Sequence, residues 1–191
     1  MPNAVPPLVA KPAYPNIPTA ITRRESDLLA ELTAGKCVLE IGSYLGYSTV
    51  WMALNGAEVH AVDPHEWLDS GPEFIANVQR YHVEDRVYDV RLRSQDLNPN
   101  GLGPAFTAAF IDGDHTYEQA RFDLQLARRL VRPGSWIIAH DYTFPGYCGG
   151  GYPEVIRAVN EVLGDLPHVK RAGVMYAARL DVSRLLEPAS G

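Results

Sequence analysis

The sequence has few cysteines, no long apolar run and no excess of basic charge. It contains 2 cysteines, Cys37 and Cys148, in 191 residues, and Cys37 falls in an apolar segment, so we expect a reducing compartment and no disulfide framework. The 17 basic and 23 acidic residues give a formal charge of −6, which offers no support for binding nucleic acid or an anionic membrane. No segment approaches the roughly 18 apolar residues of a membrane span. The N-terminus lacks the basic-then-apolar pattern of a signal peptide. We therefore expect a cytoplasmic protein.

Proline is concentrated at the N-terminus. Residues 1–20 hold six of the 15 prolines, and each proline fixes its own φ and restricts the residue before it. This segment is therefore expected to be an extended arm, and the sequence does not decide whether the arm lies over the domain. The predicted organisation is this arm at 1–20, one domain at 21–182 and a tail at 183–191.

Between residues 21 and 182, apolar positions alternate between helical and strand spacing. A capping-box pattern, Thr22 with Glu25, starts the first helix. Further helices are expected at about 47–54, 73–83, 116–130 and 154–163, and strands at about 37–41, 58–63, 87–93, 106–112, 135–140, 169–171 and 174–180. Strands that alternate with helices pair in parallel, whereas the last two strands share a short link and must be antiparallel to each other. The predicted fold class is α/β: a Rossmann-like three-layer sandwich of about seven strands, mostly parallel with an antiparallel C-terminal strand.

The first expected strand leads into a glycine loop, Gly42-Ser43-Tyr44-Leu45-Gly46, and a helix follows the loop. Such a unit brings backbone N–H groups and a helix N-terminus up to a ligand, although an ordinary turn between strand and helix has a similar composition. A dinucleotide site would require the pattern G-x-G-x-x-G, but Tyr44 and Tyr47 occupy its second and third glycine positions. The loop therefore indicates a ligand without a pyrophosphate, and an NAD-dependent oxidoreductase ranks last among the functions considered.

Polar or acidic residues stand at the C-terminal ends of all five expected parallel strands. In chain order they are Glu40, Asp63, Ser94-Gln95-Asp96, Asp112-Gly113-Asp114-His115 and His140-Asp141. Ligands of open parallel sheets bind beyond these ends, so the residues are expected to form one site. Asp63 lies about 20 residues beyond the glycines, where a carboxylate is expected to bind ribose hydroxyls. Each residue alone could instead cap a helix, and Asp63, Asp96 and Asp114 are good candidates for that role.

Taken in order, these segments resemble the motifs of class I S-adenosylmethionine-dependent methyltransferases. The similar segments are 40–49, 62–63, 94–96, 110–117, 132–134 and 140–142, within roughly residues 25–180. The branch they resemble most is the catechol O-methyltransferase-like one, together with related small-molecule and sugar O-methyltransferases. The resemblance implies transfer of a methyl group from S-adenosyl-L-methionine to a hydroxyl of a small-molecule acceptor.

The resemblance also assigns a set of residues to the cofactor. That set is Glu40, Gly42, Tyr44, Gly46, Ser48, Asp63, Ser94, Gln95 and Asp112. By the resemblance, the two glycines let the backbone approach the methionyl part, Glu40 supports the loop, and Ser48 hydrogen-bonds the cofactor carboxylate. Asp63 would bind the ribose hydroxyls, and Ser94 and Gln95 would border the adenine.

The resemblance further implies a divalent cation that binds the acceptor oxygen. In the family, carboxylates at the ends of the fourth and fifth strands hold this ion, and Asp112 and Asp141 match those positions. A site rich in oxygen ligands suits Mg²⁺. His140 stands where many relatives have a carboxylate. One possibility is that its imidazole joins Asp112 and Asp141 as a ligand, which shifts the metal preference toward Mn, Fe or Zn. The other is that His140 is not a ligand and packs under the loop. The predicted metal ligands are Asp112, Asp141 and His140.

His115 occupies the position at which relatives have a Lys or His general base, and an imidazole accepts protons near neutral pH. The alternative is a histidine at a helix terminus that bonds to the backbone, and Asp114 is the second candidate for the base. Aromatic residues and glycines beyond Asp141 are expected to line the acceptor pocket: Tyr142, Phe144, Tyr147, residues 149–151 and Tyr152. The alternative for the aromatic residues is that they cover the edge of the core.

Three functions stay open from the sequence. The first is a metal-assisted O-methyltransferase with a small hydroxylated acceptor and no nucleic-acid or membrane partner. The second keeps the cofactor without the metal, as a metal-independent O- or N-methyltransferase. The third is a non-catalytic nucleotide- or metabolite-binding module. The sequence determines neither the acceptor nor the oligomeric state, and a homodimer is among the options.

Overall fold

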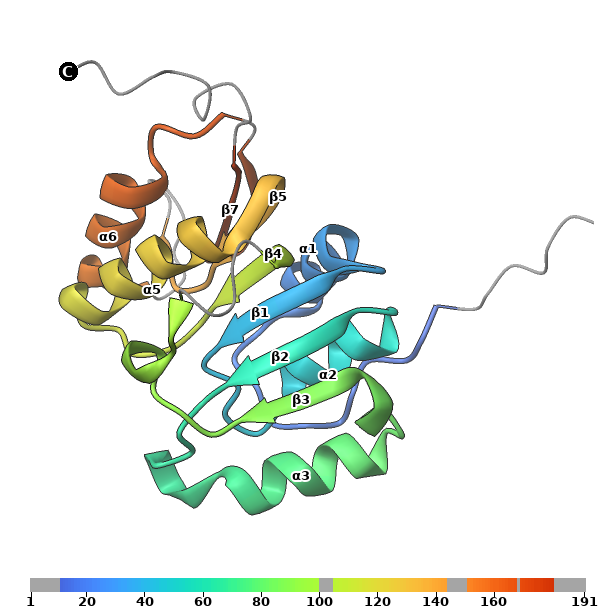
Figure 1. The fold of residues 1–191 in the computed structure, drawn as a ribbon. Coiled ribbons are helices and arrows are strands. Elements are labelled where there is room, and N and C mark those ends of the chain that lie inside the picture. The colour runs from blue at the N-terminus through green and yellow to red at the C-terminus, as the bar shows by residue number, and fades with distance from the viewer. Residues whose placement is uncertain (1–10, 100–104, 144–150, 168, 181–191) are drawn as a thin grey trace, which may run out of the picture.

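A seven-stranded sheet with the strand order β3-β2-β1-β4-β5-β7-β6 forms the centre of the molecule (Figure 1). The computed structural model describes residues 11–99, 105–143, 151–167 and 169–180. The strands are β1 (Cys37–Ile41), β2 (Glu58–Val62), β3 (Val87–Val90), β4 (Phe106–Ile111), β5 (Val131–Ala139), β6 (Lys170–Ala172) and β7 (Met175–Arg179). The α-helices are α1 (Arg23–Thr33), α2 (Tyr47–Leu54), α3 (Gly71–Arg80), α5 (Tyr117–Leu130) and α6 (Pro153–Leu163), with short 3-10 turns at Trp67–Asp69, Glu84–Arg86 and Ser94–Asp96.

The pairing of the strands confirms the predicted fold class. Strands β1 to β5 pair in parallel, whereas β7 is antiparallel to both β5 and β6. Three predicted boundaries were wrong by three residues or more. The third helix ends at Arg80 instead of residue 83. The third strand ends at Val90 instead of residue 93. The fifth begins at Val131 instead of residue 135, because Val131 pairs with Phe106 before the register shifts.

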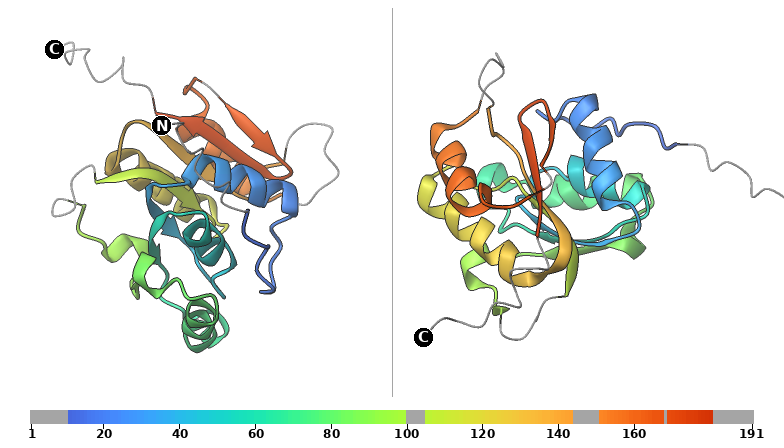
Figure 2. Two further views of the ribbon diagram at one scale, coloured as in Figure 1. Left: turned by 90° about the vertical axis from the view of Figure 1, so that its right-hand side faces the viewer. Right: turned by 90° about the horizontal axis from the view of Figure 1, so that it is seen from above.

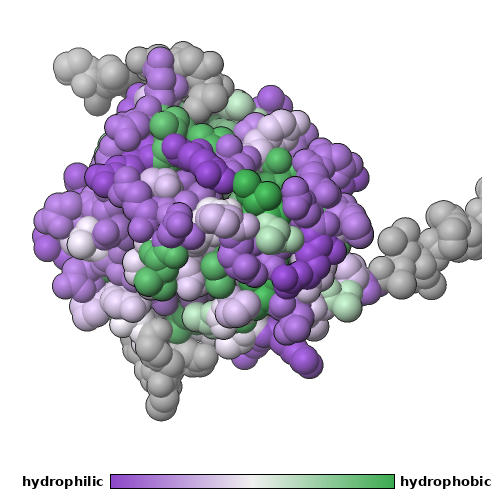
Figure 3. All heavy atoms as spheres, turned by 90° about the horizontal axis from the view of Figure 1, so that it is seen from below, coloured by the Kyte–Doolittle hydropathy of each residue, from purple (hydrophilic) through white to green (hydrophobic). Residues whose placement is uncertain are grey.

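Two helical layers cover the sheet and give it two separate cores (Figure 2). The layer of α1, α2 and α3 packs on one face around the fully buried Trp51. The layer of α5 and α6 packs on the other face, where Leu124 and Leu163 are buried. These helices carry apolar residues at i, i+3, i+4 and i+7, and that stripe is the side that faces the sheet. The face of the molecule seen in Figure 3 is mostly hydrophilic, with small separated apolar patches.

The described part of the N-terminal arm lies against the first helical layer. Tyr14 stacks on Trp51 with 4.7 Å between ring centroids, and Ile17 is buried. The backbone N–H of Asn16 donates to the Tyr81 hydroxyl at 2.5 Å. Residues 11–20 therefore belong to the domain, while residues 1–10 and the predicted tail at 183–191 lie outside the described residues. No helix in the described ranges has the length and apolar character needed to cross a membrane.

Candidate active site

The glycine loop turns back over the carboxyl end of β1 and touches the neighbouring strand. Gly42 has φ +85°, and a Cβ on it would lie 2.2 Å from the backbone oxygen of Asp112. Gly46 has φ +87°, and a Cβ on it would lie 3.0 Å from the ring of Phe74. The close approach that these glycines permit is thus made to the protein itself, to the end of β4 and to α3.

Asp63, at the end of β2, holds the glycine loop in place. Its Oδ2 accepts hydrogen bonds from the backbone N–H groups of Ser43 at 2.8 Å and Tyr44 at 2.9 Å, and its Oδ1 accepts from the N–H of His65 at 2.7 Å. Tyr44 has φ +47°, a left-handed conformation that these bonds stabilise. Of the roughly four lone-pair positions of a carboxylate, three are therefore engaged.

Glu40 lies behind the loop and is fully buried. Its Oε2 accepts a hydrogen bond from the Thr49 hydroxyl, and the Ser48 hydroxyl also bonds the carboxyl group, so β1 is tied to the first turn of α2. Within the described residues, Oε1 has no hydrogen-bond partner. Burial, with smaller contributions from the charges of Asp112 and Asp63, raises the pKa of Glu40 to about 8. From inside the protein, Glu40 therefore joins β1 to the start of α2, the two elements that flank the loop.

A buried carboxylate that sequence analysis missed holds the residues after β3. Ser94 donates its hydroxyl to Oδ1 of Asp123 at 2.5 Å, and Nε2 of Gln119 donates to the same oxygen at 2.7 Å. Asp123 is 1% exposed, and burial raises its pKa to about 6. The signal was available in the sequence, because Asp123 stands on the apolar stripe of its helix between Ala120 and Leu124. The predicted neighbour Gln95 is exposed and bonds Gln119.

The ends of β4 and β5 bring together Asp112, His115 and Asp141. Each offers one ligand atom, and these atoms all lie within 4.8 Å of one another. Nε2 of His115 lies 2.8 Å from Oδ2 of Asp141, and the His115 ring stacks on Tyr152 with 4.1 Å between centroids. The hydrogen bond to Asp141, opposed by partial burial, raises the pKa of His115. Burial alone would raise the pKa of Asp141, but His115 and His140 lower it well below its usual value.

His140 lies on the buried side of this group and is 5% exposed. Its Nδ1 is 3.3 Å from Oδ1 of Asp112 and 3.4 Å from Oδ2 of Asp141. Burial opposes the charged form of His140, but the carboxylates of Asp112, Asp141 and Glu25 raise its pKa to about 12. This position matches the alternative in which His140 packs under the loop. The group of three clustered ligand atoms contains His115 instead of the predicted His140.

Glu25, which the sequence showed only as part of a capping box, reaches the same site. The capping box is present, because Oε2 of Glu25 accepts from the backbone N–H and the hydroxyl of Thr22, both at 2.7 Å. Its Oε1 accepts from the N–H of Val174 at 2.7 Å and lies 3.9 Å from Nε2 of His140. Glu25 is 1% exposed; burial alone would raise its pKa, but the nearby charge of His140 and the hydrogen bonds from Thr22 and Val174 lower it to about 2. Glu25 therefore links α1 and the β6–β7 turn to the carboxyl edge of β5.

The remaining predicted site residues divide between surface and core. Oδ1 of Asp114 accepts the N–H of Thr116 at 2.7 Å, which is the helix-capping role left open by the sequence. Tyr142 covers the edge of the core, which is one of the two roles left open by the sequence: its ring packs 4.9 Å from Tyr176 and its hydroxyl donates to Asn160 at 2.8 Å. Tyr152 is exposed beside His115. Phe144, Tyr147 and residues 149 and 150 lie outside the described residues.

Comparison with known proteins gives matches over this same region. The model of a protein family described as a methyltransferase domain matches residues 39–142. The catechol O-methyltransferase of Mycobacterium tuberculosis is 36% identical over 112 residues, which cover 58% of this chain and 50% of that protein. The chain thus spans about half the length of the curated relatives it matches.

Solved structures share the fold over most of the chain. A cofactor-bound protein from MTB has a TM-score of 0.65 and 25% identity, over 87% of this chain and 83% of that one. An O-methyltransferase from Bacillus cereus in complex with SAH has a TM-score of 0.63 over 88% of this chain and 84% of that one. At 22% identity, the second match shows the fold alone.

Proposed function

Because the chain belongs to the methyltransferase domain family, we propose that it transfers the methyl group of S-adenosylmethionine to a hydroxyl of a small-molecule acceptor. One observation carries the proposal: the glycine loop touches the backbone of Asp112, whose carboxylate clusters with His115 and Asp141 at the carboxyl edge of one sheet. A cofactor on the loop and an acceptor beside His115 would therefore be neighbours. The similarity to a catechol O-methyltransferase supports a hydroxylated acceptor.

In the proposed cofactor site, the backbone of the glycine loop is better supported as a contact to the cofactor than the side chains of Glu40 and Ser48. The side chains of Glu40 and Ser48 bond each other behind the loop, so in this proposal they act by shaping it. Asp63 has about one lone-pair position left after its three backbone bonds, which is enough for one ribose hydroxyl. Ser43 contributes a buried hydroxyl that has no partner within the described residues, and a polar ligand group at the loop would satisfy it.

In the proposed reaction, His115 is the general base. If its Nε2 carries the proton that Asp141 accepts, Nδ1 keeps a lone pair for the proton of the acceptor hydroxyl. The acceptor oxygen then forms a bond to the sulfonium methyl carbon, the carbon–sulfur bond breaks with its electrons going to sulfur, and S-adenosylhomocysteine leaves. Tyr152 stacks on the His115 ring and holds its orientation.

The donor set fits a divalent cation. The carboxylates of Asp112 and Asp141 suit Mg²⁺ or Mn²⁺, and we propose them as the ligands that would hold the ion, with His115 beside it as the base. When bound, such a cation lowers the pKa of the acceptor hydroxyl and orients it. His140 serves beneath the carboxylates as a buried positive charge that keeps them ionised and in place.

The same position of His140 favours a second candidate, a metal-independent methyltransferase. An imidazolium between two carboxylates already balances part of their charge, so the site has an internal cation of its own. Activity that survives EDTA would select this candidate, and activity restored only by added Mg²⁺ or Mn²⁺ would select the first.

Calorimetry with S-adenosylmethionine and S-adenosylhomocysteine tests the proposal directly, followed by turnover of a panel of catechols and other hydroxylated compounds. We expect binding of both nucleosides, turnover of at least one acceptor, and loss of roughly 10²–10⁴-fold in kcat for His115→Ala with cofactor binding retained. Absence of cofactor binding by a folded protein would overturn the proposal.

A further inference from the structure

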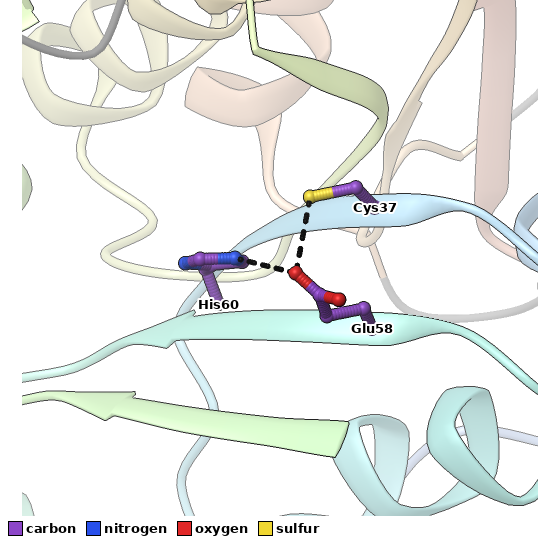
Figure 4. A group of neighbouring side chains, drawn as sticks. All are labelled: Cys37, Glu58 and His60. Carbon is purple, nitrogen blue, oxygen red and sulfur yellow. Dashed lines mark hydrogen bonds and ion pairs between the residues drawn. The ribbon is translucent and has the colours of Figure 1, made fainter. Parts of the chain in front are cut away.

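We propose that Cys37, Glu58 and His60 form a separate binding site for Zn²⁺ or a similar borderline divalent cation. The three side chains come from the starts of two neighbouring parallel strands (Figure 4). Cys37 and Glu58 are register partners in β1 and β2, and His60 lies two residues along β2, on the same face of the sheet as Glu58. The site therefore lies toward the amino ends of the strands, whereas the candidate active site lies at their carboxyl ends.

The ligand types match those of zinc. The set contains one thiol, one imidazole and one carboxylate, all three of which bind Zn²⁺ in proteins, whereas a thiolate is unsuited to Mg²⁺ or Ca²⁺. Three protein ligands leave one position of a tetrahedron for water. Cys37 is a free cysteine, so its sulfur is available for a metal.

The distances between the ligand atoms are close to those of a zinc tetrahedron. Usual zinc bond lengths place a nitrogen and an oxygen ligand about 3.4 Å apart, and a sulfur and an oxygen ligand about 3.6 Å apart. Nε2 of His60 lies 3.4 Å from Oε1 of Glu58, and Sγ of Cys37 lies 3.9 Å from the same oxygen. The third separation, between the Cys37 sulfur and the His60 ligand nitrogen, is within 4.8 Å, so the site closes around the ion when Cys37 moves inward.

Surrounding contacts hold two of the ligands in place. The His60 ring stacks on Tyr88 with 4.5 Å between centroids and meets the edge of Phe106 at 5.2 Å. The backbone N–H of Cys37 donates to the Thr107 hydroxyl at 3.0 Å, which fixes the start of β1 against β4. A site whose ligands are already oriented loses less conformational entropy when it binds an ion.

Binding is coupled to loss of a proton. Burial and the nearby Glu58 carboxylate raise the pKa of the Cys37 thiol, while the charge of Arg132 acts in the opposite direction. When the zinc–sulfur bond forms, the thiol proton is released to solvent. The bound ion would join the starts of β1 and β2, without contact with the proposed active site. It would stabilise the folded chain by RT ln(1 + c/Kd), where c is the free ion concentration, and this term rises with the logarithm of c above Kd.

Co²⁺ is a suitable probe, because a cobalt–thiolate bond produces a charge-transfer absorption band that oxygen and nitrogen ligands do not. We would titrate the reduced, EDTA-treated protein with Co²⁺ and then displace the ion with Zn²⁺. We expect one thiolate-bound Co²⁺ per chain, loss of the band on addition of Zn²⁺, and an upward shift of Tm with Zn²⁺. Cys37→Ser should abolish the band, and His60→Ala should weaken Co²⁺ binding at least about tenfold. Cys148→Ser, the matched control, should keep both the absorption band and the wild-type affinity for Co²⁺.

Several results would overturn the proposal. They are absence of the band in the wild-type protein, persistence of the band in Cys37→Ser, or Co²⁺ bound only without thiolate absorption, which would place the ion at Asp112, His115 and Asp141. Circular dichroism and melting of each metal-free variant establish that it is folded before binding is compared. Cofactor binding by Cys37→Ser is measured in parallel. Loss of the cobalt band with cofactor binding retained then reports on the metal site alone, separately from failure of the proposed methyltransferase function.

Discussion

Replacing Glu40 with glutamine should remove a specific pH dependence from the stability of the protein. The folded-state pKa of Glu40 is about 8 against a usual value of 4.5, because burial disfavours the ionised form. The folded state therefore holds this proton more tightly than the unfolded state, and stability falls as pH rises from 4.5 to about 8 and is level above that. At about 1.4 kcal/mol per pH unit inside this window, Glu40 alone lowers the free energy of unfolding by about 2 kcal/mol between pH 6 and pH 8.

Urea unfolding of the wild type and Glu40→Gln across pH 5 to 9 measures this effect. Other groups, including His140, also change stability in this range, but they are present in both proteins and cancel in the difference between the two curves. We expect the stability of the wild type, measured relative to the variant, to fall by about 2 kcal/mol between pH 6 and pH 8. Parallel curves at all pH values would refute a neutral, buried Glu40.

The other predictions concern packing, the buried carboxylate and the loop. In urea unfolding, Gly42→Ala should destabilise the fold by about 3 kcal/mol or more, because its Cβ would overlap a backbone oxygen. Its control is Gly35→Ala, also at positive φ but with nothing within 4 Å of the added Cβ, which should lose only about 1 kcal/mol. Glu25→Ala should lose about 3–5 kcal/mol, since it removes one of the three carboxylates around the buried His140 and leaves the backbone N–H of Val174 without its acceptor. Glu25→Gln, which keeps an acceptor oxygen, should lose less. Equal losses for the members of either pair would contradict these accounts. Trp67 is 67% exposed and its ring contacts Tyr44 of the loop, so S-adenosylhomocysteine should change tryptophan emission in the wild type and not in Trp67→Phe.

The sequence predicted the frame of the site well, because that frame depends on local patterns. The alternation of helix and strand periodicity predicted the seven-stranded sheet, and strand ends identified the edge where Asp112 and Asp141 meet. The glycine spacing argued against a dinucleotide. The boundary of β5 was less predictable, because Val131 enters the sheet only by pairing with Phe106 across a register shift.

The sequence predicted less well which partner each polar side chain would find. Asp63 was expected to face ribose, and in the structure most of its hydrogen-bonding capacity holds the glycine loop. Asp123 was overlooked although it stands on an apolar stripe. Both cases depend on backbone groups or side chains that approach only after the sheet and helices have packed.

By itself, the sequence determined the fold class, the order of the elements and the edge of the sheet at which the chemistry is expected. Those properties follow from hydrophobic periodicity and turn residues, which act over a few positions along the chain. Only the tertiary structure decided that Glu25 accepts a bond from Val174, 149 residues away, and lies beneath His140. Only the tertiary structure also brought Cys37, Glu58 and His60 together, because side chains of β1 and β2 meet only after these two strands, which are separated by α2, have paired in register.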